Sequence, residues 1–492
     1  MGCFPGLFYA CRALRKALRK ALRRLARLTT MQTFKVDSTA NKKIMHPHEK
    51  ALLSDPLWPL LLRMSAPNTM AFFIQVVVVL TEVWFISQLG TTELAAVALT
   101  FPIIMLTQQM AYGALGGAVA SAIARSLGGA DTASAERLLW HSLAIALCAG
   151  VVFLLVFLGL GKALLVAMGG HGLVLVEAMS YCVTFLSGAI LIWLSGTLSA
   201  ALRGMGSMRF SAMTMIMGSA IQVTLAGGLI LGWFGLPKLG LVGAPLSVIA
   251  NGAFVSLVSF IKLSHSSARV QFKLSQLLFK KALFKDIFNV ALPAFVAPVF
   301  NVGTIILLTG LVGQFGDAAL AGYGLGARIE FLMIPLIFSV GTAMSTLVGI
   351  HVGAGKIARA ESIGWLGACV TGLGSGMIGL TLVLTSHHWI TLFTTDSATY
   401  LVAKQYIEIV GLCFAFQGVG LSLYLASQGA NAMKWPVIAT ILRFVVAIVG
   451  GWAAVNYFSS GLLGVFYSSA VAMILYGLII AGAIKMGGWR KF

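Results

Sequence analysis

Three acidic residues lie inside long apolar stretches, where a charged side chain needs a specific reason to be present. The chain has 492 residues but only 14 Asp and Glu, and most of these fall in loops, at helix ends or near the termini. The exceptions are Glu82, Glu330 and Glu408, each of which is surrounded by apolar residues. At the centre of a membrane helix an unpaired ion costs at least about 2.5 to 3.5 kcal/mol. These three residues are therefore candidate functional groups.

The chemistry available to such a carboxylate is the exchange of positive ligands. Burial in a low-dielectric cavity favours the protonated form, so the group can bind a proton near neutral pH and release it when a cation arrives. Glu82 and Glu330 fall in different halves of the chain, and we expect both to serve this exchange. Structural alternatives remain open, because Glu330 could pair with Arg443, and Glu408 could pair with Lys404 one helical turn earlier.

Other kinds of active centre lack their sequence signatures. The chain contains no GxxxxGK[ST] motif for a nucleotide-driven motor and no His/Asp/Glu clustering of an intramembrane metalloprotease. The six cysteines show no CxxC spacing, and four of them sit in apolar runs. We therefore expect no enzyme activity, no metal and no cofactor, and we expect a proton or sodium gradient to supply the energy.

The elements that position the acids are long apolar segments. Hydrophobic residues make up 59% of the chain and charged residues 10%, and the mean hydropathy is +0.95. Soluble proteins carry about 25% charged residues, so the composition predicts an integral membrane protein. Each segment can span a hydrocarbon core of about 30 Å at about 1.5 Å per residue. We predict twelve transmembrane helices, over residues 57–88, 93–125, 137–160, 172–202, 209–234, 240–263, 285–314, 318–351, 359–386, 397–428, 434–458 and 460–485.

Basic residues explain the net charge of +20 without a nucleic-acid partner. Of the 34 Lys and Arg, eight lie between Arg12 and Arg27 and six between Lys262 and Lys285, and the apolar segments hold few. Alternate loops are rich in these residues, whereas the opposite loops hold little besides Lys162 and Lys238. The positive-inside rule then predicts a protein of the cytoplasmic membrane with both termini in the cytoplasm.

An internal repeat divides the chain into two lobes. At an offset of about 225 residues, several short segments match in order, among them Gln88–Ala95 with Gln314–Ala321. Six helices per lobe make the repeat parallel, about an axis along the membrane normal, and such lobes can rock around a site between them. The predicted fold is all-α, with a basic extension at 1–56, an N-lobe at 57–263, a cytoplasmic linker at 264–284, a C-lobe at 285–485 and a tail at 486–492.

The first thirty residues differ in pattern from the rest. Leucines recur every three or four positions from Leu14 to Leu28, with Arg and Lys between them, which predicts a basic amphipathic helix lying on a membrane surface. Equally, Met31 could be the true start of the protein, with the preceding segment an upstream extension.

Several segments resemble the multidrug and toxic compound extrusion family. They are Pro67 through Gly90, Ser126-Leu-Gly-Gly-Ala130, His351-Val-Gly-Ala-Gly355 and Tyr323-Gly-Leu-Gly-Ala-Arg-Ile-Glu330. Their order and spacing extend over residues 57–485, nearly the whole chain. The resemblance implies a secondary antiporter that exports cationic or amphipathic compounds through a cavity between the lobes, in exchange for protons or sodium.

The resemblance also suggests roles for particular residues. It implies that Glu82 stands where helix 1 of the family carries a coupling Asp. In helix 5 many members have an Asn and, four residues later, an Asp, whereas this chain has Gln222 and Ala226. The missing Asp favours protons over sodium, and only Glu408 suggests a sodium arrangement in the second lobe.

Three rival functions are weaker. A lipid-linked oligosaccharide flippase needs a strongly basic cavity, whereas the bases at membrane depth are few: Arg328, Lys404 and Arg443. A membrane-embedded enzyme or a channel fits the two-lobe repeat less well. We expect a monomer whose partners are membrane lipid and small molecules, and the residues predicted to bind the coupling ion or substrate are Glu82, Glu330, Glu408, Gln222 and Arg328.

Overall fold

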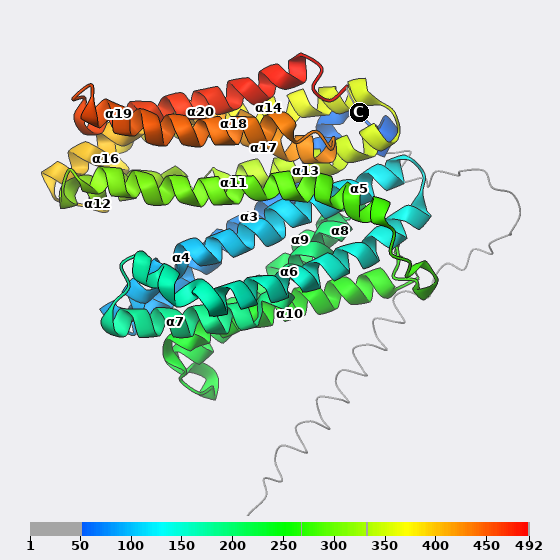
Figure 1. Ribbon diagram of the computed structural model, residues 1–492, viewed down its shortest axis with the longest axis horizontal. Helices are drawn as coiled ribbons and strands as arrows, with labels where there is room; N and C mark the ends of the chain where they lie inside the picture. The colour runs from blue at the N-terminus through cyan, green and yellow to red at the C-terminus, as the bar shows by residue number, and fades with distance from the viewer. Residues whose placement is uncertain (1–51, 267, 331–332, 491–492) are drawn as a thin grey trace, which may run out of the picture. The chain divides into compact units, whose positions relative to one another are not determined.

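The regular structure of the described residues is entirely helical (Figure 1). The computed structural model describes residues 52–266, 268–330 and 333–490. The amphipathic segment predicted over residues 1–30, and Met31, lie outside this part of the chain. The described residues belong to one compact unit, and its helices are described below.

The first half of this unit runs from α3 to α10. Its helices correspond to the first six apolar segments. Their bounds are α3 Leu57–Ser87, α4 Thr91–Gln108, α5 Gly116–Gly128, α6 Thr132–Ala167, α7 Gly172–Ser187, α8 Ala189–Gly204, α9 Met208–Leu231 and α10 Gly243–Ser264.

The second half runs from α11 to α20 and corresponds to the last six apolar segments. Its bounds are α11 Lys281–Gly313, α12 Asp317–Glu330, α13 Ile334–Gly353, α14 Ile357–Leu384, α15 Ser386–Ile390, α16 Ser397–Val410, α17 Phe414–Gly429, α18 Lys434–Val445, α19 Gly451–Asn456 and α20 Gly461–Lys485.

Within the described residues, eleven helical spans are long and apolar enough to cross a membrane. The pair α7 and α8 makes a twelfth if it counts as one span, with a bend of 48° between its two parts. Gly188 lies at this bend, where a Cβ atom would come within 2.2 Å of Ile249 Cγ1 on α10. The predicted all-α fold of twelve spans is confirmed, with α7 and α8 counted as one span. Close packing of α10 against Gly188 accompanies the bend between α7 and α8.

Helix ends follow from local chemistry. Asp131 precedes α6, and its side chain accepts a hydrogen bond from the Ser134 backbone N–H at 2.9 Å, as an N-cap should. Gly232 follows α9 with φ 82° and ψ 23°, the left-handed conformation that glycine adopts without steric cost. Two spans contain a short π-helical turn, at Gln109–Leu115 between α4 and α5 and at Val446–Gly450 between α18 and α19.

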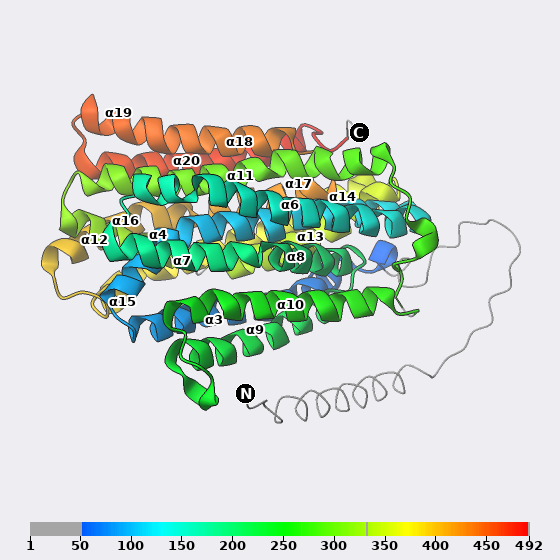
Figure 2. The ribbon, with the colours of Figure 1, turned by 60° about the horizontal axis from the view of Figure 1, so that its bottom comes forward.

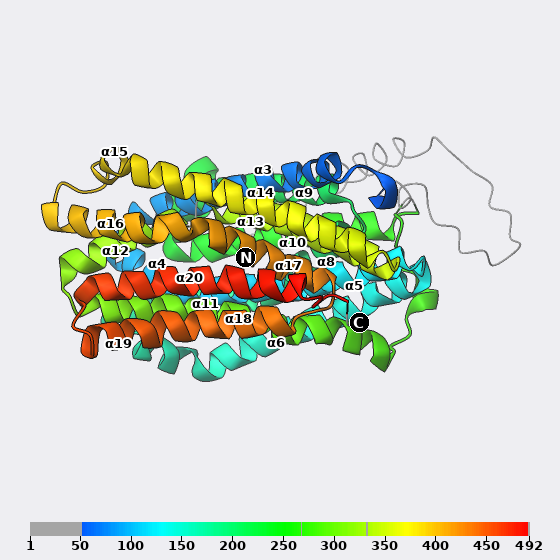
Figure 3. The same ribbon diagram turned by 90° about the horizontal axis from the view of Figure 1, so that it is seen from above.

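Each half packs mainly on itself, and the halves meet through a few helices. In the first half α9 lies between α3 and α10 (Figure 2). In the second half α14, α17, α20 and α18 lie side by side (Figure 3). Contacts between the halves are made chiefly by α13, which packs against α5 and α3, and by α11 and α17, which pack against α5. The crossing of α5 and α13 is therefore the main junction.

Candidate functional site

Glu82 lies in the last two turns of α3, on the face that packs against α9. Apolar residues flank Glu82 along α3, and the helix continues past it. Only 9% of the surface of Glu82 is exposed. An acid at this position cannot reach water freely. Its surroundings therefore decide whether it carries a charge.

A chain of side-chain amides leads to this carboxylate. Gln222 of α9 donates from Nε2 to Glu82 Oε2 at 3.2 Å, and Asn251 of α10 donates from Nδ2 to Gln222 Oε1 at 2.7 Å. Glu82 Oε1 is buried and has no hydrogen-bond partner among the described residues. Leaving a buried acceptor unpaired costs about 1 to 3 kcal/mol. The free oxygen is thus a ready acceptor for a proton or a ligand.

Further polar groups extend this cluster along α3 and α9. Ser219 donates to Gln75 Oε1 at 3.3 Å, about two turns of α3 before Glu82. Tyr181 of α7 is buried and lies close enough to interact electrostatically with Glu82. We call these residues the first-half cluster: Gln75, Glu82, Tyr181, Ser219, Gln222 and Asn251.

A glycine makes room for the outermost amide. At Gly218, a Cβ atom would lie 2.2 Å from Asn251 Oδ1, so only glycine allows α9 and the Asn251 side chain to come this close. Asn251 was not predicted from the sequence as a site residue, although it is an amide inside the apolar run of α10. A polar group in an apolar segment needs a partner, and this signal, which identified the acids, also applies to Asn251.

Glu330 forms a second polar cluster at the end of α12. The Tyr406 hydroxyl, from α16, donates a hydrogen bond to Glu330 Oε1. Tyr406 is itself packed edge-on against Tyr323 and Phe466, with ring centroids 5.4 and 5.1 Å away. At Gly326 a Cβ would lie 2.3 Å from Tyr406 Cδ1, so this glycine lets the tyrosine pack against α12. Tyr406 was not predicted from the sequence as a site residue.

Arg443 faces the same region from α18 without pairing directly. Its guanidinium lies over the ring of Tyr476 on α20, 5.4 Å from the centroid. It interacts electrostatically with Glu330 but forms no ion pair with it in the described part of the chain. We call Tyr323, Glu330, Tyr406, Arg443 and Tyr476 the second-half cluster.

The remaining predicted site residues lie apart from both clusters. Glu408 is on an exposed face of α16, with its Oε1 3.8 Å from Lys404 Nζ, which is the pairing that the sequence left open. Arg328 is exposed on α12 and has no hydrogen bond or ion pair within the described residues. Of the five predicted residues, the structure brings together Glu82 and Gln222 alone.

Side-chain hydrogen bonds between α3 and α13 join the two halves. Thr69 of α3 donates to Ser339 Oγ of α13 at 2.7 Å, and Asn68 donates to Thr342 Oγ1 at 3.3 Å. Asn68 and Thr69 lie near the middle of α3, whereas Glu82 is in its last two turns. The partners that reach Glu82 and Glu330 in the described residues each come from the same half as the acid.

Arg125 is the most connected residue of this junction. From the last turn of α5 it forms an ion pair with Asp286 of α11 at 2.8 Å. It also donates to the backbone carbonyls of Gln428 and Gly429, at the end of α17, at 3.3 and 3.2 Å. One side chain therefore ties the first half to two helices of the second.

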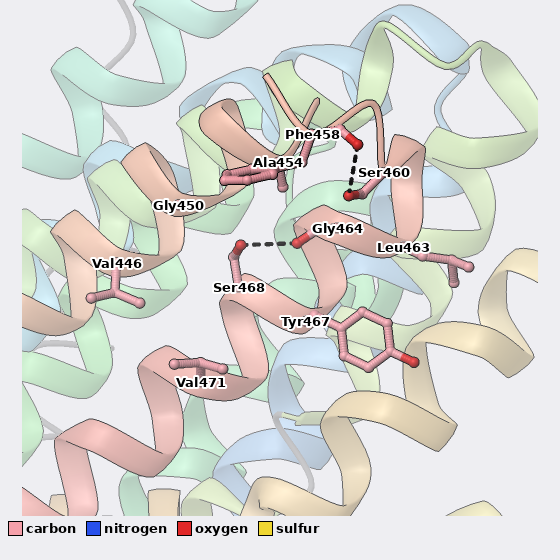
Figure 4. A pocket seen from close by; sticks show the side chains of 10 residues that line it. All are labelled: Val446, Gly450, Ala454, Phe458, Ser460, Leu463, Gly464, Tyr467, Ser468 and Val471. Carbon is pink, nitrogen blue, oxygen red and sulfur yellow. Dashed lines mark hydrogen bonds between the residues drawn. The ribbon is translucent and has the colours of Figure 1, made fainter. Parts of the chain in front are cut away.

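A separate groove lies between α19 and α20 and has a volume of about 540 Å³ (Figure 4). Its lining includes Phe458, Tyr467 and Val471, which are largely exposed. No acidic or basic side chain lines it, and it shares no residue with either cluster. It therefore offers no means of holding a coupling ion. Across the described residues, no group of three or more His, Cys, Asp or Glu could hold a metal ion.

Comparison with known proteins gives a consistent family. A family model described as MatE matches residues 67–226 and 293–453. The probable multidrug resistance protein NorM of Thermotoga maritima is 24% identical over 439 residues, which are 88% of this chain and 93% of the relative. An FAD transporter of Shewanella oneidensis is 23% identical over 87% of this chain and 94% of its own length.

Solved structures agree on the fold. A transporter of the MOP superfamily from Pyrococcus furiosus superposes with a TM-score of 0.83 at 23% identity, over 93% of this chain and 100% of that one. At this level of identity the likeness concerns the arrangement of the helices alone.

Proposed function

The chain belongs to the MatE family of membrane transporters, and from this premise we propose that it exports cationic or amphipathic small molecules in exchange for protons. Members of the family are transporters rather than enzymes, and this chain is a multi-pass membrane protein. What the family alone leaves open is the coupling ion, the group that carries it and the compound exported.

The observation that carries the proposal is the half-satisfied carboxylate of Glu82. One oxygen is held by Gln222, and the other is buried without a partner among the described residues. Protonation of the free oxygen neutralises the acid and suits an apolar setting. Loss of that proton leaves a negative charge that an organic cation can satisfy. A single acid can thus serve two competing positive ligands, which is the requirement for exchange.

The donors around Glu82 favour a proton over sodium. Hard cations are bound by oxygen atoms. Gln222, however, turns its NH₂ group toward Glu82, because its own oxygen accepts from Asn251. Ala226, four residues further along α9, supplies no ligand. A proton needs only the free carboxylate oxygen, so this surrounding is sufficient for proton exchange.

Alternating access is supported by the position of the contacts between the halves. The junction involves Arg125 and the ends of α5, α13 and α17, next to loops rich in Lys and Arg. We assign this end to the cytoplasm, with both termini on that side of the cell membrane. Closure there is consistent with a state open to the opposite side. Protonation of Glu82 would then accompany the return to the other state, in a monomer.

Transport by proteoliposomes tests the coupling. Ethidium, a fluorescent organic cation, serves as the probe, with proton and sodium gradients imposed independently. We expect the wild-type protein to move ethidium in the direction opposite to protons that flow down the imposed gradient. Ethidium transport by Glu82→Gln should fall to the level of protein-free liposomes. FAD is added as a competitor, because one relative is described as an FAD transporter.

The matched control is Glu93→Gln, an equal change of charge in the first turn of α4 and outside both clusters. It should transport ethidium as the wild type does. Full proton-driven export by Glu82→Gln would remove the proposal, and export driven by sodium alone would replace the proton with sodium. Gradient-driven transport of FAD, measured in parallel, with no transport of ethidium would overturn the assignment of a cationic substrate.

A further inference from the structure

We propose that the linker between the halves, residues 264–284, is a docking surface for anionic phospholipid. This inference depends on the membrane setting of the protein and not on the coupling ion. It starts from an unusual combination: the linker is held firmly against the first half, yet it exposes both apolar and basic side chains away from that contact.

The inner face of the linker is bound to the start of α6. Lys273 Nζ forms an ion pair with Glu136 at 2.7 Å, and Arg137 Nε donates to Gln276 Oε1 at 2.8 Å. Trp140 Nε1 donates to the Lys273 carbonyl at 3.1 Å. These side chains lie within two turns of α6, so the linker follows a defined path along one helix.

His141 fixes the end of that path. Its Nε2 accepts a hydrogen bond from the Lys280 backbone N–H at 2.9 Å, and its Nδ1 lies 2.7 Å from the Arg137 carbonyl. The rings of Phe279 and Phe284 pack against the imidazole with centroids 5.3 and 4.5 Å away. These contacts hold the end of the linker against α6, next to the start of α11.

The outer face of the linker is apolar. Leu274, Leu277 and Leu278 are 79%, 45% and 58% exposed, respectively. These residues belong to the segment that joins the end of α10 to the start of α11 (Figure 2). Because both helices span the membrane, this segment lies at the membrane boundary. Apolar side chains at that depth insert among the acyl chains next to the headgroups.

The charge on this face selects the kind of lipid. Lys280 and Lys281 are exposed and follow the apolar residues directly, and residues 264–285 contain no Asp or Glu. The nearest acids are already used, because Glu136 pairs with Lys273 and Asp286 pairs with Arg125. Unneutralised lysines at a membrane surface attract anionic headgroups. The same geometry gives no reason to prefer a zwitterionic lipid.

Lipid titration tests the charge. Phosphatidylglycerol or phosphatidylcholine is added to the delipidated full-length protein in detergent, and bound lipid is counted by native mass spectrometry. We expect tighter binding of phosphatidylglycerol. Since each lysine near the surface contributes about a factor of five, the pair Lys280→Gln and Lys281→Gln should weaken it about thirtyfold. The Lys280 backbone N–H remains, so the bond to His141 is kept.

The control for charge is the pair Lys162→Gln and Lys238→Gln, which removes two exposed lysines, one in the last two turns of α6 and one in the segment after α9. It should leave the affinity for phosphatidylglycerol unchanged. Equal binding of the two lipids by the wild type, or undiminished binding after the change at Lys280 and Lys281, overturns the proposal. Thermal melts of every variant exclude misfolding as the cause of a loss.

The apolar part is tested separately. Leu277→Ser with Leu278→Ser should weaken binding of both lipids, whereas Leu392→Ser with Phe393→Ser, an exposed apolar pair in another loop, should not. Soluble polyglutamate carries negative charge without acyl chains, and we expect it to bind weakly. If polyglutamate binds as tightly as phosphatidylglycerol and depends on Lys280 and Lys281, the surface binds an acidic protein segment and the lipid assignment is wrong.

Discussion

At the scale of single residues, Glu82 and Glu330 each receive one hydrogen bond from a neighbouring helix. For Glu82 the donor is the amide of Gln222, and for Glu330 it is the hydroxyl of Tyr406. The amide is committed as a donor because Asn251 occupies its oxygen, whereas the tyrosine is held in place by aromatic packing. The two halves thus reach a similar arrangement with different side chains.

The bond between Tyr406 and Glu330 can be removed without disturbing the packing. Tyr406→Phe keeps the ring against Tyr323 and Phe466 but deletes the hydroxyl donor. Loss of a hydrogen bond to a buried acid costs about 1 to 3 kcal/mol, so we expect a lower melting temperature and slower proton-driven transport. Tyr467→Phe, whose ring lies in the surface groove, is the control and should change neither. An unchanged Tyr406→Phe protein would show that this bond has no role.

At the scale of helices, the crossing of α5 and α13 depends on glycine. A Cβ at Gly128 would lie 2.0 Å from the Ile350 carbonyl oxygen, and one at Gly353 would lie 2.0 Å from that of Arg125. Each helix therefore contacts the backbone of the other where a side chain would prevent it. Small residues allow such close approach between membrane helices.

Gly128→Ala is expected to force this crossing apart. The new methyl group meets backbone rather than a flexible side chain, and overpacking of this kind costs about 1 to 3 kcal/mol. The melting temperature should fall, and amide hydrogen exchange should increase at the ends of α5 and α13. Gly159→Ala, where the added Cβ has open space, supplies the comparison and should have little effect. Equal stability of the two variants would contradict the role given to the crossing.

At the scale of the whole described unit, Arg125 joins the halves through three polar contacts. Its ion pair with Asp286 and its bonds to the end of α17 connect three helices across the junction. If the halves separate at this end during transport, these contacts must break in each cycle. Their strength then affects the balance between the two states.

Arg125→Gln should weaken closure of the junction. We expect faster hydrogen exchange at the start of α11 and the end of α17, together with a changed transport rate. Asp286→Asn should act in the same direction, and the double variant should show a coupling energy of about 0.5 to 3 kcal/mol, as for residues in direct contact. Arg63→Gln, an exposed arginine on α3, is the control. Additive effects of the two changes would mean that the pair does not hold the junction.

The sequence by itself determined the membrane character and the helical segments, and it predicted Glu82 and Glu330 as the acids inside apolar spans that serve the exchange. Helix length, apolar composition and the cost of a buried charge are local properties, so they can be read along the chain. Even the alternative pairing of Glu408 with Lys404 was visible, because both residues lie on one helix.

Only the tertiary structure decided which groups surround those acids. Asn251, Tyr406 and Arg125 become important through helices distant in sequence, and nothing near them in the chain indicates their partners. Their contacts depend on the rotation of each helix and on where glycine permits close approach, as at Gly218 and Gly326. Tertiary packing sets these quantities, because many weak contacts act together and no short stretch of sequence contains them.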